Sequence, residues 1–323
     1  MNNSNSSASS AVSQLTESIV SEIGKVVVGK DPLIQDVIAA FLARGHVLFE
    51  DVPGLGKTLL ARSIAACLGL EYRRLQCTPD LLPGDITGGY MLNPESGSFE
   101  LRHGPVFTNI LLADEINRAS PKTQSALLQA MQEGEVSIEG RTFPLPRPFF
   151  VMATQNPVEY EGTFPLPEAQ LDRFIMKTSV GYPDRDQECR ILRYRIDRKQ
   201  DEAVVHKVVD QHLLQQAFDE IEGVHVSADL ERYIVDVVAA TRRDRGVTVG
   251  ASPRGSLALL KLARSRARQA DRNFIIPDDI TRFASSALAH RIVLSPDLWT
   301  RPGAAERVVS QCLQSVPVPV IHS

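Results

Sequence analysis

The sequence predicts an α/β protein, in which a parallel sheet carries helices on both faces and a smaller, all-helical domain follows. Short apolar runs alternate with helical patterns from Leu15 to about Val180, which is typical of such a sheet. From about Gly223 onward, helical patterns dominate. The length of 323 residues suits two domains, at roughly 150 residues per domain.

The first elements follow a polar start. Residues 1–14 are nearly all Ser, Asn and Ala, so we expect a disordered tail there and an α/β core over residues 15–182. Residues 46–49 form an apolar run that predicts a buried strand, and a Gly/Pro loop follows it. A helix is predicted over residues 57–68 and ends at Gly69, a residue that favours helix C-termini.

The second half of the core repeats this alternation. Residues 108–113 predict another buried strand, which leads into an acidic pair. Ser120 is a good N-cap with Pro121 at the first helical position, and this helix is predicted to end at Gly134. Two more strands are predicted at residues 149–153 and 174–180.

The C-terminal part differs in character. Residues 183–222 are charged and helix-prone, which suits a helical connector, and residues 223–323 are predicted to form a helical domain. Ser227 caps a run that continues through Ala240, and further helices are predicted over residues 256–269 and from Pro277. Four arginines spread around the second of these helices and predict a solvated face: Arg264, Arg266, Arg268 and Arg272.

Bulk composition narrows the class of protein. The formal net charge of −4 gives no basic footprint for nucleic acid, and no apolar run reaches the roughly 18 residues that span a bilayer. The four cysteines are scattered, and no histidine lies at a zinc-binding spacing. These features predict a cytoplasmic protein with reduced thiols and without a membrane span.

The strongest local motif is the segment DVPGLGKT at residues 51–58, between the first strand and its helix. It fits the phosphate-binding pattern G-x-x-x-x-G-K-[ST], except that Asp51 stands in place of the first Gly. Backbone N–H groups of such a loop face phosphate oxygens, the lysine contacts the β and γ phosphates, and the threonine holds Mg²⁺. We expect Asp51 to turn away from the anion. The residues predicted to bind nucleotide here are Pro53, Gly54, Leu55, Gly56, Lys57, Thr58 and Leu59.

An acidic pair supplies the second half of the predicted site. Asp114 and Glu115 directly follow a buried strand, so their carboxylates lie at the carboxyl edge of the sheet, beside the phosphate loop. We expect Asp114 to bind Mg²⁺ through water and Glu115 to orient and polarise the attacking water. Such a pair favours hydrolysis over transfer of phosphate to a small molecule.

Several segments resemble the MoxR family of AAA+ ATPases. They are VPGLGKTLLARSIA at residues 52–65, LLPGDITG at 81–88, GPVFTN at 104–109, LLADEINRASPKTQSALLQAMQEGEV at 111–136, ATQNP at 153–157 and LPEAQLDRF at 166–174. GASPRGSLALLKLAR, at residues 250–264, resembles the start of the family's lid helix. The resemblance implies an AAA+ core with a helical lid.

The resemblance also implies roles for residues outside the phosphate loop. Asn156 resembles sensor 1, an amide that helps to hold the γ-phosphate and the attacking water, and Arg254 resembles sensor 2 of the lid. Arg173 resembles the arginine finger, which reaches the γ-phosphate of a neighbouring subunit; its alternative is a surface pair with Asp172 or Glu168. Val28 and Gly29 resemble the segment beside adenine.

By resemblance, the protein is an ATP-hydrolysing motor that uses Mg²⁺ and assembles as a hexameric ring. Its work would be the remodelling or maturation of a protein client, with metal-cofactor insertion as one form, beside a partner with a von Willebrand factor A domain. Residues 88–102 and 134–145 read as hairpins, which in the wider clade face the pore or the partner, although surface decoration is the alternative.

Three other functions share parts of this pattern. A DNA-acting AAA+ motor would need a basic pore hairpin, whereas the two predicted hairpins and their flanks offer only Arg102, Arg141 and Arg147. A P-loop kinase leaves the combination of Glu115, Asn156 and Arg173 unexplained. A magnesium-chelatase-type motor subunit shares the clade's parts and remains an alternative.

Overall fold

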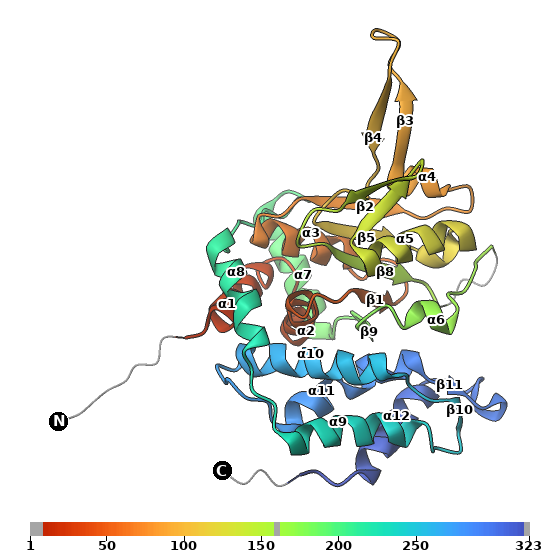
Figure 1. Ribbon diagram of the computed structural model, residues 1–323. Helices are drawn as coiled ribbons and strands as arrows, with labels where there is room; N and C mark the ends of the chain where they lie inside the picture. Colours follow the sequence, from red (N-terminus) through yellow and green to blue (C-terminus); the bar gives the residue numbers. More distant parts are fainter. Residues whose placement is uncertain (1–8, 158–161, 320–323) are drawn as a thin grey trace.

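The computed structural model describes residues 9–157 and 162–319, in an α/β core with a helical domain packed beneath it (Figure 1). A parallel five-stranded sheet organises the core in the order β2-β5-β8-β1-β9. Its strands are β1 (Val47–Glu50), β2 (Tyr72–Gln76), β5 (Ile110–Asp114), β8 (Phe150–Gln155) and β9 (Met176–Thr178).

Alternating side chains of the sheet enter two separate hydrophobic clusters. Val47 and Phe49 of β1 pack with the helices α1 (Ala11–Ile23), α2 (Asp31–Leu42) and α3 (Lys57–Leu68), whereas Leu48 packs with α5 (Pro121–Glu133) on the other face. The period of two residues in a strand produces this division. The prediction of a parallel sheet covered on both faces is therefore confirmed.

Local sequence signals set the ends of the helices beside the site. Gly69 and Gly134, which terminate α3 and α5, both have positive φ angles, of 64° and 66°. The Ser120 hydroxyl accepts a hydrogen bond from the Thr123 N–H and caps α5. These ends are as predicted, because capping depends on residues that are close in the sequence.

The N-terminal helix corrects one prediction. Residues 1–8 lie outside the described part, but α1 begins at Ala11, within the stretch expected to be a disordered tail. Ser10 caps it, and Val12 and Leu15 are fully buried. The prediction was wrong because it considered the Ser- and Ala-rich composition and not the apolar helix face that starts at Ala11.

Two antiparallel hairpins extend from the core. The pair β3 (Gly88–Leu92) and β4 (Phe99–His103) projects far from the sheet (Figure 1), and β6 (Glu135–Ile138) pairs with β7 (Arg141–Pro144) after α5. Both lie where hairpins were predicted. The remaining short helices of the core are α4 (Pro83–Thr87), η1 (Ile116–Arg118) and α6 (Glu168–Leu171).

Residues 183–222 contain two helices with different surroundings. In α7 (Arg185–Arg198) no residue is buried, whereas α8 (Gln211–Glu222) buries Leu214, Ala217 and Ile221 against the core. The second helix thus contributes to the hydrophobic core.

The C-terminal domain is built from α9 (Ala228–Thr241), α10 (Pro253–Gln269), α11 (Pro277–Leu288) and α12 (Ala304–Ser315). It also contains short 3₁₀ segments, η2 (Ala289–Arg291) and η3 (Pro296–Leu298), and a small sheet that was not predicted, β10 (Val247–Val249) with β11 (Val293–Leu294). Among the described residues, no helix is long and apolar enough to cross a membrane.

The arginines of α10 and its end correct a second prediction. Arg264 and Arg268 form ion pairs with Glu222 and Glu220 of α8, at 3.3 and 2.8 Å, and Arg272 pairs with Asp279 of α11 at 2.7 Å. The side chains of these three arginines are only 16–25% exposed. They therefore join helices instead of forming a solvated face.

Candidate functional site

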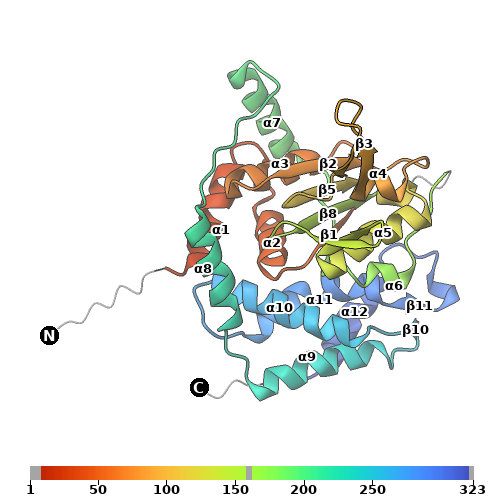
Figure 2. The same ribbon diagram turned by 45° about the horizontal axis from the view of Figure 1, so that its top comes forward.

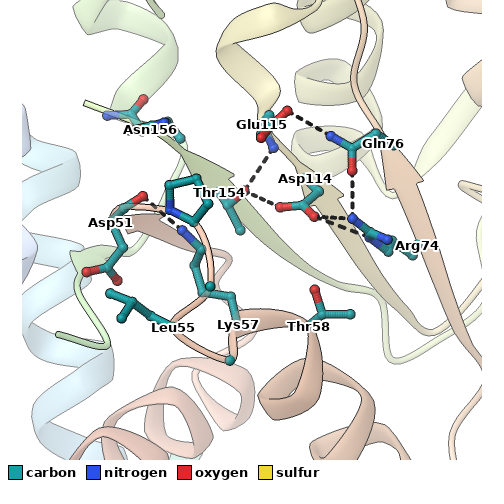
Figure 3. A pocket seen from close by; sticks show the side chains of 14 residues that line it. Asp51, Leu55, Lys57, Thr58, Arg74, Gln76, Asp114, Glu115, Thr154 and Asn156 are labelled. Carbon is teal, nitrogen blue, oxygen red and sulfur yellow. Dashed lines mark hydrogen bonds and ion pairs between the residues drawn. The ribbon is translucent and has the colours of Figure 1, made fainter. Parts of the chain in front are cut away.

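The candidate site is a pocket at the carboxyl ends of β1, β5 and β8 (Figure 3). The chain leaves β1 towards β2 at one edge of the sheet, and it leaves β8 towards β9 at the other edge. The strand order thus reverses between β1 and β8, which is where open α/β sheets bind ligands. The topology alone therefore favours this position.

The loop after β1 is shaped to receive an anion. Gly54 and Gly56 have φ angles of 87° and 83°, and beyond the adjacent chain no atom lies within 4 Å of the position that a Cβ would occupy at either residue. Gly56 is directly followed by α3, whose N-terminal N–H groups attract negative charge. The loop thus forms an open cradle of backbone at a helix N-terminus.

Lys57 lies at the centre of this cradle. Its ammonium group donates to the backbone carbonyl oxygen of Asp51 at 2.9 Å (Figure 3). It also donates to the carbonyl oxygen of Val52 at 3.2 Å. Burial lowers the pKa of Lys57, and the nearby carboxylates of Asp51, Asp114 and Glu115 partly offset this effect. These two hydrogen bonds hold the side chain in the pocket, and a bound anion, which attracts the ammonium group more strongly than a carbonyl oxygen does, can replace them.

Asp51 turns away from the cradle. Its buried carboxylate accepts hydrogen bonds from the backbone N–H groups of Val180 and Gly181, at 2.5 and 3.3 Å. The residue that departs from the usual glycine therefore anchors the phosphate loop to the chain that leaves β9.

Asp114 is fixed by two neighbouring strands. Arg74 of β2 donates to its carboxylate at 2.7 Å, and the Thr154 hydroxyl of β8 donates to it at 2.6 Å. The same Thr154 oxygen accepts a hydrogen bond from the Glu115 N–H at 2.8 Å. Thr154 is only 1% exposed, so it links both members of the acidic pair inside the sheet.

Glu115 has an unusual backbone and a fixed side chain. Its φ and ψ angles of 56° and 50° lie in the left-handed region, which costs a non-glycine residue about 1–3 kcal/mol. Its carboxylate accepts a hydrogen bond from Gln76 at 2.8 Å (Figure 3). It also accepts one from Arg118 at 3.2 Å. Strain of this kind accumulates at functional sites, where the surroundings hold it in place.

The pocket brings together most of the residues predicted from the loop and the acidic pair. Its lining includes Pro53, Gly54, Leu55, Gly56, Lys57, Thr58, Asp114, Glu115 and Asn156. Leu59, Val28 and Gly29 do not line it. Gly29 instead faces the Gln187 side chain of α7, with no room for a Cβ between them.

Arg173 and Arg254 lie at a different place. They share a second pocket with Arg44 and Lys261, near the amino ends of β1 and β9. Asp172 does not pair with Arg173: its carboxylate contacts Arg291 at 2.7 Å and Ser252 at 3.1 Å. Within the described residues, the buried Nε of Arg173 makes no hydrogen bond.

Arg291 fastens the C-terminal domain to the segment around Arg173. Its side chain is 3% exposed and donates to the Asp172 carboxylate and to the carbonyl oxygens of Phe174 and Ile175, at 2.7, 2.6 and 3.2 Å. Burial lowers the pKa of Arg291, and the charge of Asp172 partly restores it. The two domains therefore meet in a buried ion pair beside Arg173.

Replacement of Arg291 by alanine is expected to lower the free energy of unfolding by about 3 kcal/mol, because the Asp172 carboxylate, only 18% exposed, then loses its ion-pair partner. Urea unfolding followed by circular dichroism measures this loss. Arg282→Ala is the matched control, because the Arg282–Asp36 pair is 31% and 26% exposed and should contribute less than about 1 kcal/mol. Equal losses for the two variants would contradict a special role for Arg291.

Sequence reasoning missed four residues of the pocket: Arg74, Gln76, Thr154 and Gln155. Arg74 and Gln76 belong to β2, whose residues pair in register with β5, so that Gln76 lies opposite Asp114. The available signal was the position of this segment directly after α3, where a β-α-β unit requires a strand.

Comparisons with known proteins agree with this geometry. Residues 46–176 match the family model "ATPase family associated with various cellular activities (AAA)", and residues 239–311 match "AAA lid domain". The chain is 42% identical to chaperone MoxR1 of Mycobacterium tuberculosis, over 95% of this chain and 83% of that protein. It is 46% identical to the uncharacterized protein YeaC of Bacillus subtilis, over 94% and 95% of the two chains. A solved structure of a Cytophaga hutchinsonii protein assigned as an ATPase superposes with a TM-score of 0.89, at 39% identity and 96% coverage of both chains.

Proposed function

The chain belongs to the MoxR family of AAA+ ATPases and hydrolyses ATP, and from this premise we propose that it works as a chaperone that remodels or matures a protein client. The observation that carries the proposal is that Arg173 lies apart from the phosphate loop and the acidic pair of its own chain, as in a motor whose sites are completed by neighbouring subunits. The phosphate loop and acidic pair lie at one edge of the sheet, and Arg173 lies at the other.

The residues present fit a nucleotide with Mg²⁺. The open glycine cradle would receive phosphates, with Lys57 as the counter-charge, and the Thr58 hydroxyl and the Asp114 carboxylate are oxygen ligands of the kind that Mg²⁺ prefers. When bound, Mg²⁺ supplies charge neutralisation for the phosphates. Asp114 would bind it through water, since Arg74 and Thr154 already contact this carboxylate.

Glu115 would orient the attacking water and accept its proton. Gln76 and Arg118 hold the carboxylate at a fixed place at the edge of the pocket, and the strained backbone directs it there. Asn156, on the opposite side of the same pocket, offers a polar side chain to the water and the terminal phosphate. These assignments use general-base catalysis and electrostatic stabilisation.

Arg173 would complete the site of a neighbouring subunit in a hexameric ring. It lies away from the phosphate loop of its own chain, and its Nε makes no hydrogen bond within the described residues. Arg254, at the start of α10, lies 4.0 Å from Asp172 and would report the nucleotide state through the lid.

A protein client fits the projecting hairpin better than nucleic acid does. Leu92 and Phe99 form a cross-strand pair near the hairpin end and are 56% and 70% exposed. Aliphatic and aromatic side chains contact polypeptide, whereas a phosphate backbone requires basic groups. A partner with a von Willebrand factor A domain would deliver the client, and metal-cofactor insertion is one form that the maturation would take.

Capture of the client in the ATP-bound form tests this function. The Glu115→Gln protein is expected to retain client and partner in ATP and to release them in ADP, and mass spectrometry identifies them. Lys57→Ala, which weakens phosphate binding, is the control that should retain neither. Stimulation of the ATPase by DNA, together with salt-dependent DNA affinity, would contradict a protein client.

A further inference from the structure

The helix α7 is an exposed element that follows Val180 and Gly181, the segment that is hydrogen-bonded to Asp51 of the phosphate loop. None of its fourteen residues is buried, and it projects from the body at the top of Figure 2. Leu192 and Ile196 are 60% and 65% exposed, and Cys189 is exposed as well. An exposed apolar patch of this kind marks an interaction surface.

These three residues form one stripe that points away from the molecule. Gln187 faces Gly29 of the core, and Tyr194 and Arg198, seven and eleven residues later, are the other partly covered positions of α7. Cys189, Leu192 and Ile196 are spaced by three and four residues and therefore lie together on the opposite face of the helix. This is the pattern of a helix that docks into a groove.

A matching groove lies at the other edge of the core. Buried or partly buried apolar side chains line it together with the charged residues Arg44, Glu133 and Arg147, and Gln132 of α5 and Gln215 of α8 are exposed at its rim. The apolar lining includes Met131, Leu145, Pro146, Phe149 and Phe218. It continues into the pocket of Arg173 and Arg254, because Arg44, His46, Met131 and Gln132 line both.

Helix α7 and the groove lie at opposite ends of the strands of the sheet, so that they can meet between two neighbouring copies of the chain. Helix α7 follows the carboxyl end of β9, on the side of the phosphate loop, whereas the groove lies before β1 and β8, on the side of Arg173. If Arg173 enters the neighbour's phosphate pocket, the groove edge of one chain must face the α7 edge of the next. This is a head-to-tail contact, which closes into a ring when the rotation permits.

We propose that the stripe Cys189–Leu192–Ile196 of one subunit docks into the Met131–Phe149–Phe218 groove of the next subunit. The proposal rests on the head-to-tail ring proposed above and names a contact that forms it. The occupant of the groove is a second copy of this chain, because the same edge must approach the neighbour's phosphate pocket for Arg173 to act there.

Cysteine cross-linking tests the contact directly, since Cys189 is exposed and Cys67, Cys77 and Cys312 are buried. Gln132→Cys and Gln215→Cys place a second thiol at the rim of the groove. With ATP and Mg²⁺, a short bis-maleimide is expected to join these variants into a ladder of covalent oligomers on a denaturing gel. Adding Cys189→Ser should abolish the ladder.

Gln129→Cys and Gln216→Cys are the matched controls, because they are exposed on the same two helices and lie outside the groove. Equal ladders for rim and control variants would overturn the proposal. The proposal would also be overturned if mass photometry detects rings but the rim variants give no specific ladder. The proposed ring would then stand, and only the proposed contact of α7 would be wrong. Covalent dimers of the unsubstituted protein would show that α7 pairs with α7, which also overturns it.

Removal of the stripe tests its energetic role. Leu192→Ala with Ile196→Ala should leave folding intact, because no residue of α7 is buried, and should raise the protein concentration for half-assembly at least about tenfold. Val235→Ala is the control, since this valine is 54% exposed on the lid helix α9. An unchanged assembly concentration in the double variant would contradict the docking.

Discussion

Arg173→Ala is expected to lower kcat by about 10³–10⁵-fold while leaving ATP affinity almost unchanged. The reason is the position of the side chain, which lies at the opposite edge of the sheet from the phosphate loop of its own chain. Under the proposed arrangement, its charge would act in a neighbour's site, on the transferring phosphate. Steady-state phosphate release and equilibrium binding of a fluorescent ATP analogue measure the two quantities.

Mixing experiments decide whether Arg173 acts between subunits. Arg173→Ala and Glu115→Gln should each be inactive, but an equal mixture should regain activity in about a quarter of its sites, where an intact Glu115 meets an intact Arg173 from the next subunit of a head-to-tail ring. Normal hydrolysis by pure Arg173→Ala would refute the assignment. Mixed rings without recovered activity would show that Arg173 acts within its own chain.

Asp172, one of the two alternative partners of Arg173 within the chain, is already engaged. Asp172 directs its two carboxylate oxygens to Arg291 and Ser252. Loss of activity in Arg173→Ala would therefore not arise from a broken Asp172–Arg173 pair. Thermal unfolding of the variant should match the unsubstituted protein to within the small change expected of a surface substitution.

Glu115→Gln is expected to bind ATP and to lose about 10²–10⁴-fold in turnover, the contribution typical of a general base. Glutamine has the same shape and retains an oxygen that can accept from Gln76 and Arg118, so the pocket should keep its form. Only the ability to take a proton is lost. Single-turnover hydrolysis with radiolabelled ATP separates this loss from product release.

Glu306→Gln is the matched control for that variant. Glu306 is exposed in the first turn of the lid helix α12, far along the chain from the pocket, and its neutralisation should leave turnover unchanged. Normal turnover in Glu115→Gln would remove Glu115 as the base. A parallel loss in Glu306→Gln would mean that net charge, and not the position of the carboxylate, controls the rate.

Short-range sequence signals predicted the central elements of the core. The strands β1 and β5 are continuous apolar runs, and α3 and α5 carry their own end signals at Gly69, Ser120 and Gly134. The strand β2 lacked such a signal, because it is an edge strand that exposes Arg74 and Gln76. The strands β10 and β11, of three and two residues, are too short to show a period.

In the candidate site, too, the contiguous motifs were predicted and the contacts between distant residues were not. The loop at residues 51–58 and the acidic pair are contiguous motifs, and the sequence predicted that the pocket contains them. The contacts from Gln76 to Glu115 and from Thr154 to Asp114 join residues about 40 positions apart and depend on the register of three strands. The attachment of Arg291 to Asp172 depends on how the two domains pack, which no local pattern encodes.

The hydrogen bonds of Asp51 have a consequence for how binding and assembly depend on each other. They tie the phosphate loop to Val180 and Gly181, five and four residues before α7 begins at Arg185. Linkage then requires reciprocity: any factor by which nucleotide strengthens the docking of α7 is also the factor by which docking strengthens nucleotide binding. A dilution series at fixed ATP and an ATP titration at fixed protein would thus report one and the same coupling free energy.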